Sequence, residues 1–391
     1  MPFYTEATPK LSAFAPRKRA TSSAIRKFFV LSQNTTSTLA EIALQSISND
    51  RIDTFECSAW RSNGFSDSAI LRLTCALGAF SIRSWPNRFD TPSKIEFWAA
   101  TNETFNDNER SLKNVGASTN IPFPVLTQWK PHGDHAVFVL PFEDKLWTLC
   151  SWVQGQPIAS NQVDKALVVH LATVLGRLHA RPLGLQSMQS NSLRERLEVL
   201  KSLDHRLFSL IDQTTFFSSS HLSDRLKHCM AIVLERGPDW QRFLSVGGRQ
   251  MRACHWIVRD LWRENILLDD SKRFSSIVDL GAARIDWPGL DFIRLFGSLS
   301  YDSGHDLSVD GSSKNELWQD AFAAYTNELP SHAIESLEEC KMMHMVSVGL
   351  SIAQWVRWIQ SGTIDLRNSE KAQRVAERVR ELCDQFLMEA S

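Results

Sequence analysis

The sequence lacks several features that would place a protein in a class at once. Its 43 basic and 44 acidic residues nearly cancel, and no long run of one charge sign occurs, so the basic surface of a nucleic-acid-binding protein is not expected. No stretch approaches the roughly 20 apolar residues that span a bilayer, and the first residues lack the apolar core of a secretory signal. We therefore expect a cytoplasmic protein that binds neither nucleic acid nor membrane.

Cysteine pairs at redox or zinc spacing are also missing. The seven cysteines are scattered along the chain without a C-x-x-C pair, which is typical of reduced thiols in a cytoplasm. Two Cys–His neighbours occur, His228–Cys229 and Cys254–His255. Adjacent side chains seldom point at one ion, and no second pair lies at zinc spacing, so no zinc site is predicted.

What is present is a globular composition with an irregular beginning. The chain has 391 residues, 43% of them hydrophobic and 22% charged, which is enough for one large domain or two lobes. Residues 1–35 mix Pro, Ser, Thr and basic residues without periodicity, as a tail or arm does. A short helix is predicted over 36–48. We assign residues 1–50 to an N-terminal arm that carries this helix.

Residues 51–149 are rich in strand signals. The runs AILRLT and AFSIRSW flank a turn at 76–78 and predict a β-hairpin. A helix is predicted over 92–106, and the runs VFVLPF and KLWTLCSW predict two further strands. This region is expected to form a small antiparallel sheet, the first lobe of the protein.

Residues 150–391 are expected to form a mainly helical second lobe. Between Val163 and His179 the leucines and valines recur at helical spacing and form one apolar stripe. Further helices are predicted at 192–213, 222–236, 314–326, 331–359 and 369–389. The short apolar runs ACHWIVRD, NILLDD and FSSIVDL interrupt them, and a turn at 269–272 suits the connection of two strands. The predicted fold class is therefore α+β with two lobes.

These interrupting strands carry the residues with chemical potential. Phosphoryl transfer from ATP needs oxygen ligands for magnesium, a group that orients the acceptor hydroxyl, and a cation on the phosphates. Asp260 and Asn265 stand in V-R-D-L-W-R-E-N, with four residues between them, which is the spacing of a kinase catalytic loop. Asp279 follows in V-D-L-G, where a kinase has D-F-G.

The segment HWIVRDLWRENILLDD…SSIVDLGAARIDWPGLDFIRLFGSL resembles the H-G-D-x-x-x-x-N and I-D-F-x-x-x-x-x-x-P-x-x-D-L-A signature of the aminoglycoside phosphotransferase and choline kinase-like family. The resemblance implies a bilobal protein kinase-like fold with ATP and Mg2+ as cofactors. It also implies that Asp260 orients or deprotonates the substrate hydroxyl, that Asn265 and Asp279 bind magnesium, and that Asp291 braces the catalytic loop. Val258 and Arg259 stand where the motif has His and Gly.

The first lobe offers candidates for the nucleotide site. Gly64 and Ser66 lie in a turn between two predicted strands, where a loop that covers the phosphates would belong. Strand alternation places Ser81 and Arg83 on one face, a small residue under the adenine and a cation at the phosphates. The cation is Arg where kinases have Lys, and the two hold phosphate differently. Glu96, on the helix that follows, is the predicted ion-pair partner of Arg83, with Glu103 of the same helix as the alternative.

Three further candidates flank these motifs. The segment 149–153, with Cys150 and Trp152, is predicted to be the hinge between the lobes, whose backbone would hydrogen-bond adenine. A plain linker with a buried tryptophan is the alternative. Arg284 could reach a phosphate or an acidic substrate group, or form a salt bridge with Asp286 or Asp291. Arg294 is expected to pair internally.

The sequence thus predicts an ATP-dependent phosphotransferase that acts on a hydroxyl of a small molecule. The alternative is a catalytically impaired pseudokinase, a nucleotide-binding or scaffold module in which Arg83, Val258 and the single-glycine loop record lost catalysis. A third reading is an all-helical interaction protein in which the motif arose by coincidence. Substrate specificity is expected to lie in the helices at 185–245 and 314–391. Neither the acceptor nor the oligomeric state follows from the sequence.

Overall fold

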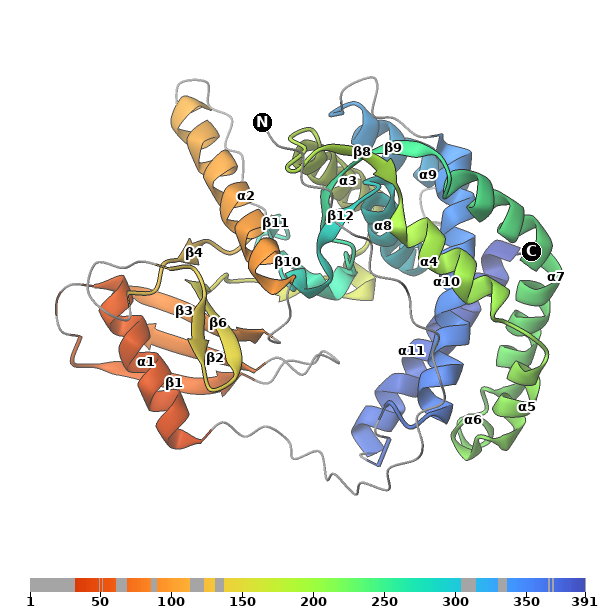
Figure 1. The fold of residues 1–391 in the computed structure, drawn as a ribbon, viewed down its shortest axis with the longest axis horizontal. Helices are drawn as coiled ribbons and strands as arrows, with labels where there is room; N and C mark the ends of the chain where they lie inside the picture. Colours follow the sequence, from red (N-terminus) through yellow and green to blue (C-terminus); the bar gives the residue numbers. More distant parts are fainter. Residues whose placement is uncertain are drawn as a thin grey trace, which may run out of the picture.

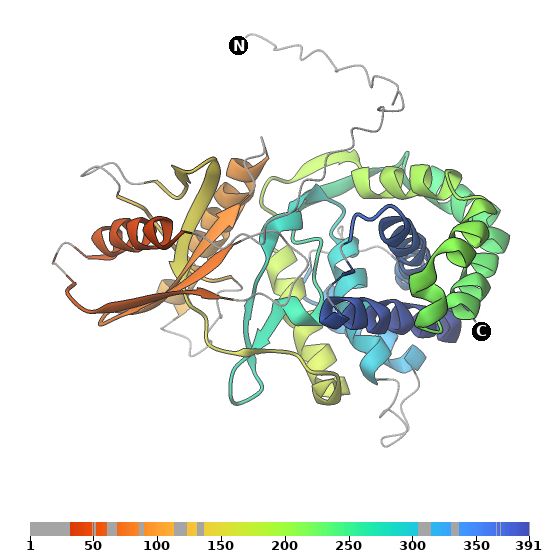
Figure 2. The same ribbon diagram turned by 90° about the horizontal axis from the view of Figure 1, so that it is seen from below.

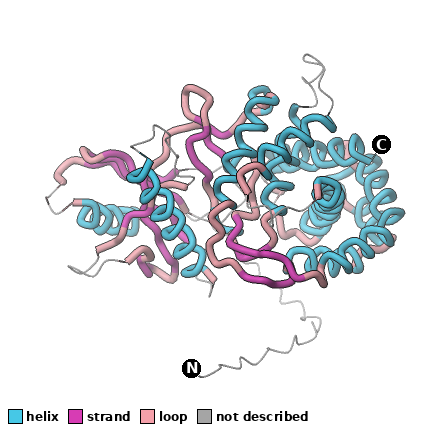
Figure 3. The backbone as a smooth tube through the Cα atoms, turned by 90° about the horizontal axis from the view of Figure 1, so that it is seen from above, coloured by secondary structure: helices cyan, strands magenta, loops and turns pink. Residues whose placement is uncertain are grey.

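The chain folds into two lobes in a computed structural model (Figure 1). The structure describes residues 32–48, 50, 52–60, 69–85, 90–112, 123–130, 137–303, 314–329, 336–364, 366–367 and 369–390. One lobe contains an antiparallel sheet and the other is mainly helical, with short strands in the region between them (Figure 3). The predicted α+β bilobal kinase-like fold is confirmed.

The first lobe is built on a six-stranded antiparallel sheet. Its strands follow the order β1-β2-β3-β6-β4, and β5 pairs with β6. The predicted hairpin is confirmed as β2 and β3, because Gly78, with a φ of 125°, permits the tight turn between them. The strands are β1 Phe55–Trp60, β2 Ile70–Cys75, β3 Gly78–Trp85, β4 Leu126–Thr127, β5 Leu140–Phe142 and β6 Lys145–Ser151.

Two helices cover the two sides of this sheet. Helix α1 (Gln33–Ile47) packs Leu39 and Ala43 against the sheet residues Leu71 and Ile82, which are all fully buried. Helix α2 (Thr91–Leu112) lies on the other side, between the sheet and the helical lobe (Figure 2). Although α1 was predicted to belong to a loosely attached arm, its apolar stripe makes it part of the first lobe.

The second lobe contains nine helices within the described residues. Helix α7 continues eleven residues beyond its predicted end at 236, through Pro238, because Trp240 and Leu244 bury their side chains on the far side of the proline. The helices are α3 Lys165–His179, α4 Asn191–Lys201, α5 Arg206–Gln213, α6 Thr215–Ser219, α7 Ser223–Gly247, α8 Gly289–Ser303, α9 Lys314–Thr326, α10 Leu337–Gln360 and α11 Ser369–Ala390.

Two three-stranded sheets interrupt these helices and face the first lobe. One has the order β11-β10-β7 and the other β12-β9-β8. The predicted pairing of the NILL and FSSI runs is confirmed as β10 and β11. The strands are β7 Gln156–Pro157, β8 Gln186–Gln189, β9 Met251–Ile257, β10 Ile266–Leu268, β11 Phe274–Ile277 and β12 Arg284–Asp286. The loops after β9 and β11 carry the two motifs.

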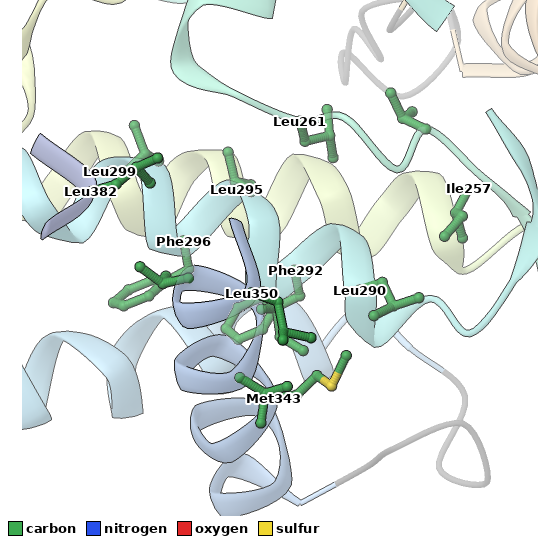
Figure 4. Packing of buried hydrophobic residues seen from close by; sticks show 14 of the residues in the cluster. Ile257, Leu261, Leu290, Phe292, Leu295, Phe296, Leu299, Met343, Leu350 and Leu382 are labelled. Carbon is green, nitrogen blue, oxygen red and sulfur yellow. The ribbon is translucent and has the colours of Figure 1, made fainter. Parts of the chain in front are cut away.

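Helix α8 lies in the large hydrophobic core and holds the loop after β9, which carries Asp260, against it. Its residues Leu290, Phe292 and Phe296 are buried together with Met343 and Leu350 of α10 (Figure 4). Leu261, the residue after Asp260, enters the same core with 1% of its surface exposed. The polar motif is therefore anchored by an apolar neighbour in its own loop.

All seven cysteines are free thiols. Within the described part of the chain, every helix is too short or too polar to cross a bilayer.

Candidate active site

The face of the first-lobe sheet that carries the candidate site residues is set by the pairing of β2, β3 and β6. Ser81 lies directly opposite Arg72 on one side and Cys150 on the other, so these three side chains share one face of the sheet. Arg83, two residues along β3, lies on the same face. The opposite face carries Ile82 and the core that α1 covers. Alternation along β3 thus separates the candidate site residues from the core.

Arg83 reaches across to the second lobe and forms an ion pair there. Its guanidinium Nη2 lies 2.5 Å from Asp279 Oδ1, and its carbon lies 5.0 Å from the centroid of the Trp85 ring. The Nε of Arg83 is buried and has no hydrogen-bond partner among the described residues. The Nε–H of Arg83 is therefore a buried donor that a ligand could satisfy.

The predicted pairing of Arg83 with Glu96 is wrong. Glu96 is exposed on α2, while Lys94 of the same helix is buried and donates from Nζ to the carbonyl oxygen of Gly281, at 2.7 Å. The helix directs Glu96 to the exposed side because its neighbours Ile95 and Phe97 fill the core. Lys94 gave no signal in the sequence, since it belongs to no motif.

Asp279 has a left-handed backbone, with a φ of 65°, and accepts a hydrogen bond from the N–H of Gly281 at 3.2 Å. Burial raises the pKa of its carboxyl, but the charge and hydrogen bond of Arg83, together with the Gly281 N–H, outweigh burial and hold the pKa below its ordinary value. Asp279 is therefore an ionised carboxylate at neutral pH.

Removing the guanidinium in Arg83→Gln is expected to change how stability depends on pH. In the folded wild type the pKa of Asp279 lies below its ordinary value of about 4. The ionised carboxylate therefore contributes its full stabilisation of the fold above about pH 4, and this contribution disappears as pH falls through the lowered pKa. In the variant burial dominates and raises the pKa instead. The difference in free energy of unfolding between the two proteins should therefore grow with pH across this range, as urea unfolding would measure. A constant difference would contradict the assigned cause.

The catalytic loop joins Asp260, Asn265 and Asp279 through its backbone. Asn265, at the end of the short 3-10 helix η2 (Arg263–Asn265), donates from Nδ2 to the carbonyl oxygen of Asp260 at 2.9 Å. The carbonyl of Asn265 accepts from the N–H of Val278 at 2.8 Å. The first bond closes the D-x4-N loop on itself, and the second places this loop next to the D-x-G loop.

Asp260 is held from α8 rather than from its own loop. Arg294 Nη2 lies 3.2 Å from Asp260 Oδ1. The same guanidinium lies over the ring of Trp262, 3.3 Å from the centroid, and Arg378 of α11 lies over that ring at 3.7 Å. The expected internal pairing of Arg294 thus has the candidate catalytic carboxylate as its partner. The tryptophan, packed by two cations, limits where Arg294 can lie.

Asp291 is completely buried beneath the loop. Its carboxylate accepts hydrogen bonds from the backbone N–H groups of Val258, at 2.7 Å, and Arg259, at 2.5 Å. His179 Nε2 lies 3.3 Å from the same carboxylate, and its Nδ1 lies 2.9 Å from the Tyr325 hydroxyl. The start of α8 therefore holds the two residues that precede Asp260.

The position where the motif has Gly is occupied by a strained arginine. Arg259 has a φ of 69°, a left-handed conformation that glycine adopts readily and other residues adopt at a cost of about 1 to 2 kcal/mol. Its side chain pairs with Glu195 at 3.1 Å. Arg284 pairs with Glu195 and Asp286, at 2.7 and 3.0 Å, rather than with Asp291.

The hinge segment is more engaged in the sheet than predicted. The N–H of Trp152 donates to the carbonyl of Ala79, and the N–H of Ser151 donates to that of Val125, so neither is open to adenine. Cys150 is buried, and burial raises the pKa of its thiol to about 12. The hinge therefore belongs in part to the strand pairing of the first lobe.

Trp152 instead contributes to an aromatic cluster on the face of the sheet that carries Arg72 and Arg83. Its ring lies 4.8 Å from that of Trp60, and the guanidinium carbon of Arg72 lies 4.9 Å from the Trp152 ring centroid. Neither Trp60 nor Arg72 was predicted. The strand pairing could have indicated Arg72, because it lies opposite Ser81. Gly64 and Ser66 lie outside the described residues.

Two lobes, with a D-x4-N loop and a D-x-G loop facing an arginine of the first lobe, define a phosphotransferase of the kinase-like class. The model of the phosphotransferase enzyme family matches residues 62–331, and the chain belongs to this family. The prediction of the family is thereby confirmed.

Solved structures agree with this assignment at the level of the fold. An amicoumacin kinase, hAmiN, solved with AMP-PNP, Ca2+ and Ami, is 12% identical, with a TM-score of 0.51 over 90% of this chain and 94% of that one. An aminoglycoside phosphotransferase from Alicyclobacillus acidocaldarius is 13% identical, with a TM-score of 0.49 over 85% of this chain and 91% of that one. No curated protein sequence matches the chain.

Proposed function

We propose that this protein is a small-molecule kinase that transfers the γ-phosphoryl group of Mg-ATP to an alcohol. The observation that carries the proposal is the convergence of Asp260, Asn265, Asp279 and Arg83 from three segments of the chain. A contact of 2.9 Å holds Asp260 and Asn265 together within one loop, one of 2.8 Å joins this loop to the D-x-G loop, and one of 2.5 Å joins the D-x-G loop to the first lobe. A hydroxyl acceptor, a metal-ligating pair and a cation are the parts that phosphoryl transfer requires.

Asn265 and Asp279 have the donor atoms that a magnesium ion needs. The amide of Asn265 uses its N–H toward the carbonyl of Asp260, which leaves its oxygen as the ligand. Asp279 is ionised and offers a second oxygen ligand. Magnesium prefers such hard oxygen ligands and keeps several positions for phosphate oxygens and water. When bound, it would neutralise charge on the phosphates that are transferred and released.

Asp260 would orient the acceptor hydroxyl and accept its proton. Arg294 binds one carboxylate oxygen, so the other oxygen is the proposed acceptor. Asp291 would fix the backbone before Asp260 and thereby its direction. The proposed nucleotide site is lined by Ser81, Arg83, Cys150 and Trp152. It would lie between a first lobe of residues 51–149, to which α1 is added, and a second lobe of residues 150–391.

A nucleotide-binding module without transfer activity is the second candidate. It is favoured by the ion pairs that occupy both carboxylates, Arg83 on Asp279 and Arg294 on Asp260. Each pair engages one carboxylate oxygen and offsets the charge of the carboxylate, so a protein that keeps both pairs with nucleotide bound, and in which the second oxygens stay out of reach of metal and acceptor, would not transfer phosphate. The two candidates differ in whether the pairs exchange when nucleotide and metal bind.

Calorimetric titration of ATP with and without Mg2+ tests the proposal. Wild type should bind ATP more tightly with Mg2+ than without it. Asp279→Asn should weaken binding of ATP in the presence of Mg2+ at least about tenfold, since loss of even a residue that supports a metal ligand lowers metal affinity about 10- to 100-fold. Asp270→Asn, an exposed carboxylate in the β10–β11 turn, is the matched control. Equal affinity of wild type for ATP with and without Mg2+ would contradict the proposed metal site, and absence of ATP binding would contradict the proposed function.

A further inference from the structure

A cavity of about 260 Å³ opens beside Asp260 in the second lobe. Besides Asp260 and Trp262 of the catalytic loop, its walls come from α8, α10 and α11, and Arg196 reaches it from α4. The cavity is smaller than the roughly 300 to 1,000 Å³ that sites for drug-sized ligands occupy. Its contact with Asp260 makes it the place where an acceptor alcohol would lie, in the function proposed above.

The lining of this cavity is cationic. Three arginines contribute to it, Arg196, Arg259 and Arg294, whereas Asp260 is the single acidic residue among the described residues that line it. Arg294 pairs with Asp260, and Arg259 pairs with Glu195 outside the cavity. A positively charged acceptor would meet an excess of like charge here.

Arg196 is the guanidinium without a counter-ion. Its Nε donates to the Ser347 hydroxyl at 3.2 Å and its Nη1 to the carbonyl of Ser192 at 3.3 Å. In the described part of the chain no carboxylate lies within ion-pairing distance of it. Burial, together with the nearby charges of Arg259 and Arg284, lowers the pKa of Arg196 to about 10, although the carboxylates of Asp286 and Glu195 offset part of this shift.

The nearby carboxylates are already used by other groups. Asp286 accepts hydrogen bonds from the Ser190 hydroxyl, the Ser192 N–H and the Trp287 N–H, and it pairs with Arg284. Glu195 is shared between Arg259 and Arg284.

Farther along the cavity wall, His344 pairs with Glu389 of α11, at 2.9 Å. Arg196 is half-buried, and a charge partly removed from water is normally paired, so an anionic ligand in the cavity would supply the counter-ion that Arg196 lacks.

We propose that this cavity binds the anionic group of the acceptor, with Arg196 as its principal ligand. The substrate would then be a small alcohol that also carries a carboxylate or a phosphate ester, rather than a polycation such as an aminoglycoside. Carboxylate and phosphate share the chemistry that a guanidinium recognises, two oxygens in the plane of its N–H groups. The hydroxyl of such a molecule would extend toward Asp260.

Inorganic phosphate is the probe for the anion site, and its binding can be measured by calorimetry without nucleotide. Arg196→Gln should weaken phosphate binding at least about tenfold, because a hydrogen bond between charged groups is lost. Arg242→Gln, on the exposed side of α7, should leave it unchanged, and Arg83→Gln should retain the site. No binding by wild type, or loss in Arg83→Gln alone, would overturn the proposal.

A second variant tests the anion site without altering Arg196. Ser351 lines the same cavity from α10, and Ser351→Asp leaves every arginine in place while adding a negative charge. Ser351→Asp should weaken phosphate binding about as much as Arg196→Gln does. Arg196→Lys keeps the positive charge, so it should bind phosphate more tightly than Arg196→Gln and less tightly than wild type. Unchanged binding in Ser351→Asp would place the phosphate elsewhere and overturn the assignment.

Matched acceptors then identify the anionic group. Wild type should transfer phosphate to glycerate or to glycerol phosphate with a kcat/KM at least about tenfold above that for glycerol or ethanolamine. In Arg196→Gln the KM for the anionic acceptor should rise while that for glycerol stays constant. Preference for glycerol or ethanolamine would overturn this inference and leave the kinase proposal intact. Failure to bind Mg-ATP would overturn the kinase proposal, while the phosphate titration would still decide the anion site.

Discussion

Asp260→Asn is expected to abolish phosphoryl transfer while leaving nucleotide binding intact. The substitution keeps the shape of the side chain and its contact with Arg294, but removes the charge that would accept the proton of the acceptor hydroxyl. Loss of a positioned general base costs about 100- to 10,000-fold, so kcat should fall by this factor. Steady-state assay of ADP release would measure kcat, and calorimetry would measure the dissociation constant for Mg-ATP.

The comparison with Asp279→Asn separates the two roles. Asp279→Asn should weaken nucleotide binding, Asp260→Asn should not, and Asp270→Asn should change neither quantity. Equal loss of Mg-ATP binding in the first two variants would show that Asp260 and Asp279 do not have separate functions. Full activity in Asp260→Asn would assign proton acceptance to another group.

Asp291→Ala is expected to cause the largest loss of stability among these variants. The carboxylate is fully buried and accepts the N–H groups of Val258 and Arg259, with His179 beside it. Alanine would leave these donors unsatisfied in the core, at a cost of about 3 to 5 kcal/mol in free energy of unfolding. Urea denaturation followed by circular dichroism would measure this free energy.

Asp224→Ala is the matched control, because Asp224 also lies in the first turn of a helix but is exposed on α7. Its loss should stay within about 1 kcal/mol, which is the usual effect of a surface charge at a helix N-terminus. Similar losses in the two variants would mean that Asp291 acts only on the helix dipole and does not brace the catalytic loop.

Local pattern was sufficient for the elements and the order of the motifs. Alternation in AILRLT and AFSIRSW predicted the hairpin β2–β3, and the 3.6-residue stripe between Val163 and His179 predicted α3, because both patterns depend on neighbours in the chain. The D-x4-N and D-x-G spacings likewise identified Asp260, Asn265 and Asp279 as candidates. Helix α7 was predicted too short, since a proline ends a helix by local rules while buried side chains beyond it keep this one going.

Partnerships across the fold were beyond such patterns. Glu96 was chosen for Arg83 by analogy and by its place in the following helix, but Ile95 and Phe97 turn that helix so that Lys94, and not Glu96, contacts the second lobe at Gly281. The engagement of Ser151 and Trp152 in the sheet follows from pairing with Val125 and Ala79, residues more than 25 positions away in the chain.

By itself, the sequence determined the two-lobed order of elements, the position of the phosphoryl-transfer motifs and the absence of a dominant charge. Only the tertiary structure decided which charges face one another: Arg83 on Asp279, Arg294 on Asp260, and Arg196 in a cavity whose one described carboxylate, Asp260, is paired with Arg294. The physical reason is that periodicity specifies which face a side chain occupies, whereas an ion pair depends on how separate elements pack. The charge of the cavity beside Asp260 is therefore a property of how helices α4, α8, α10 and α11 pack together.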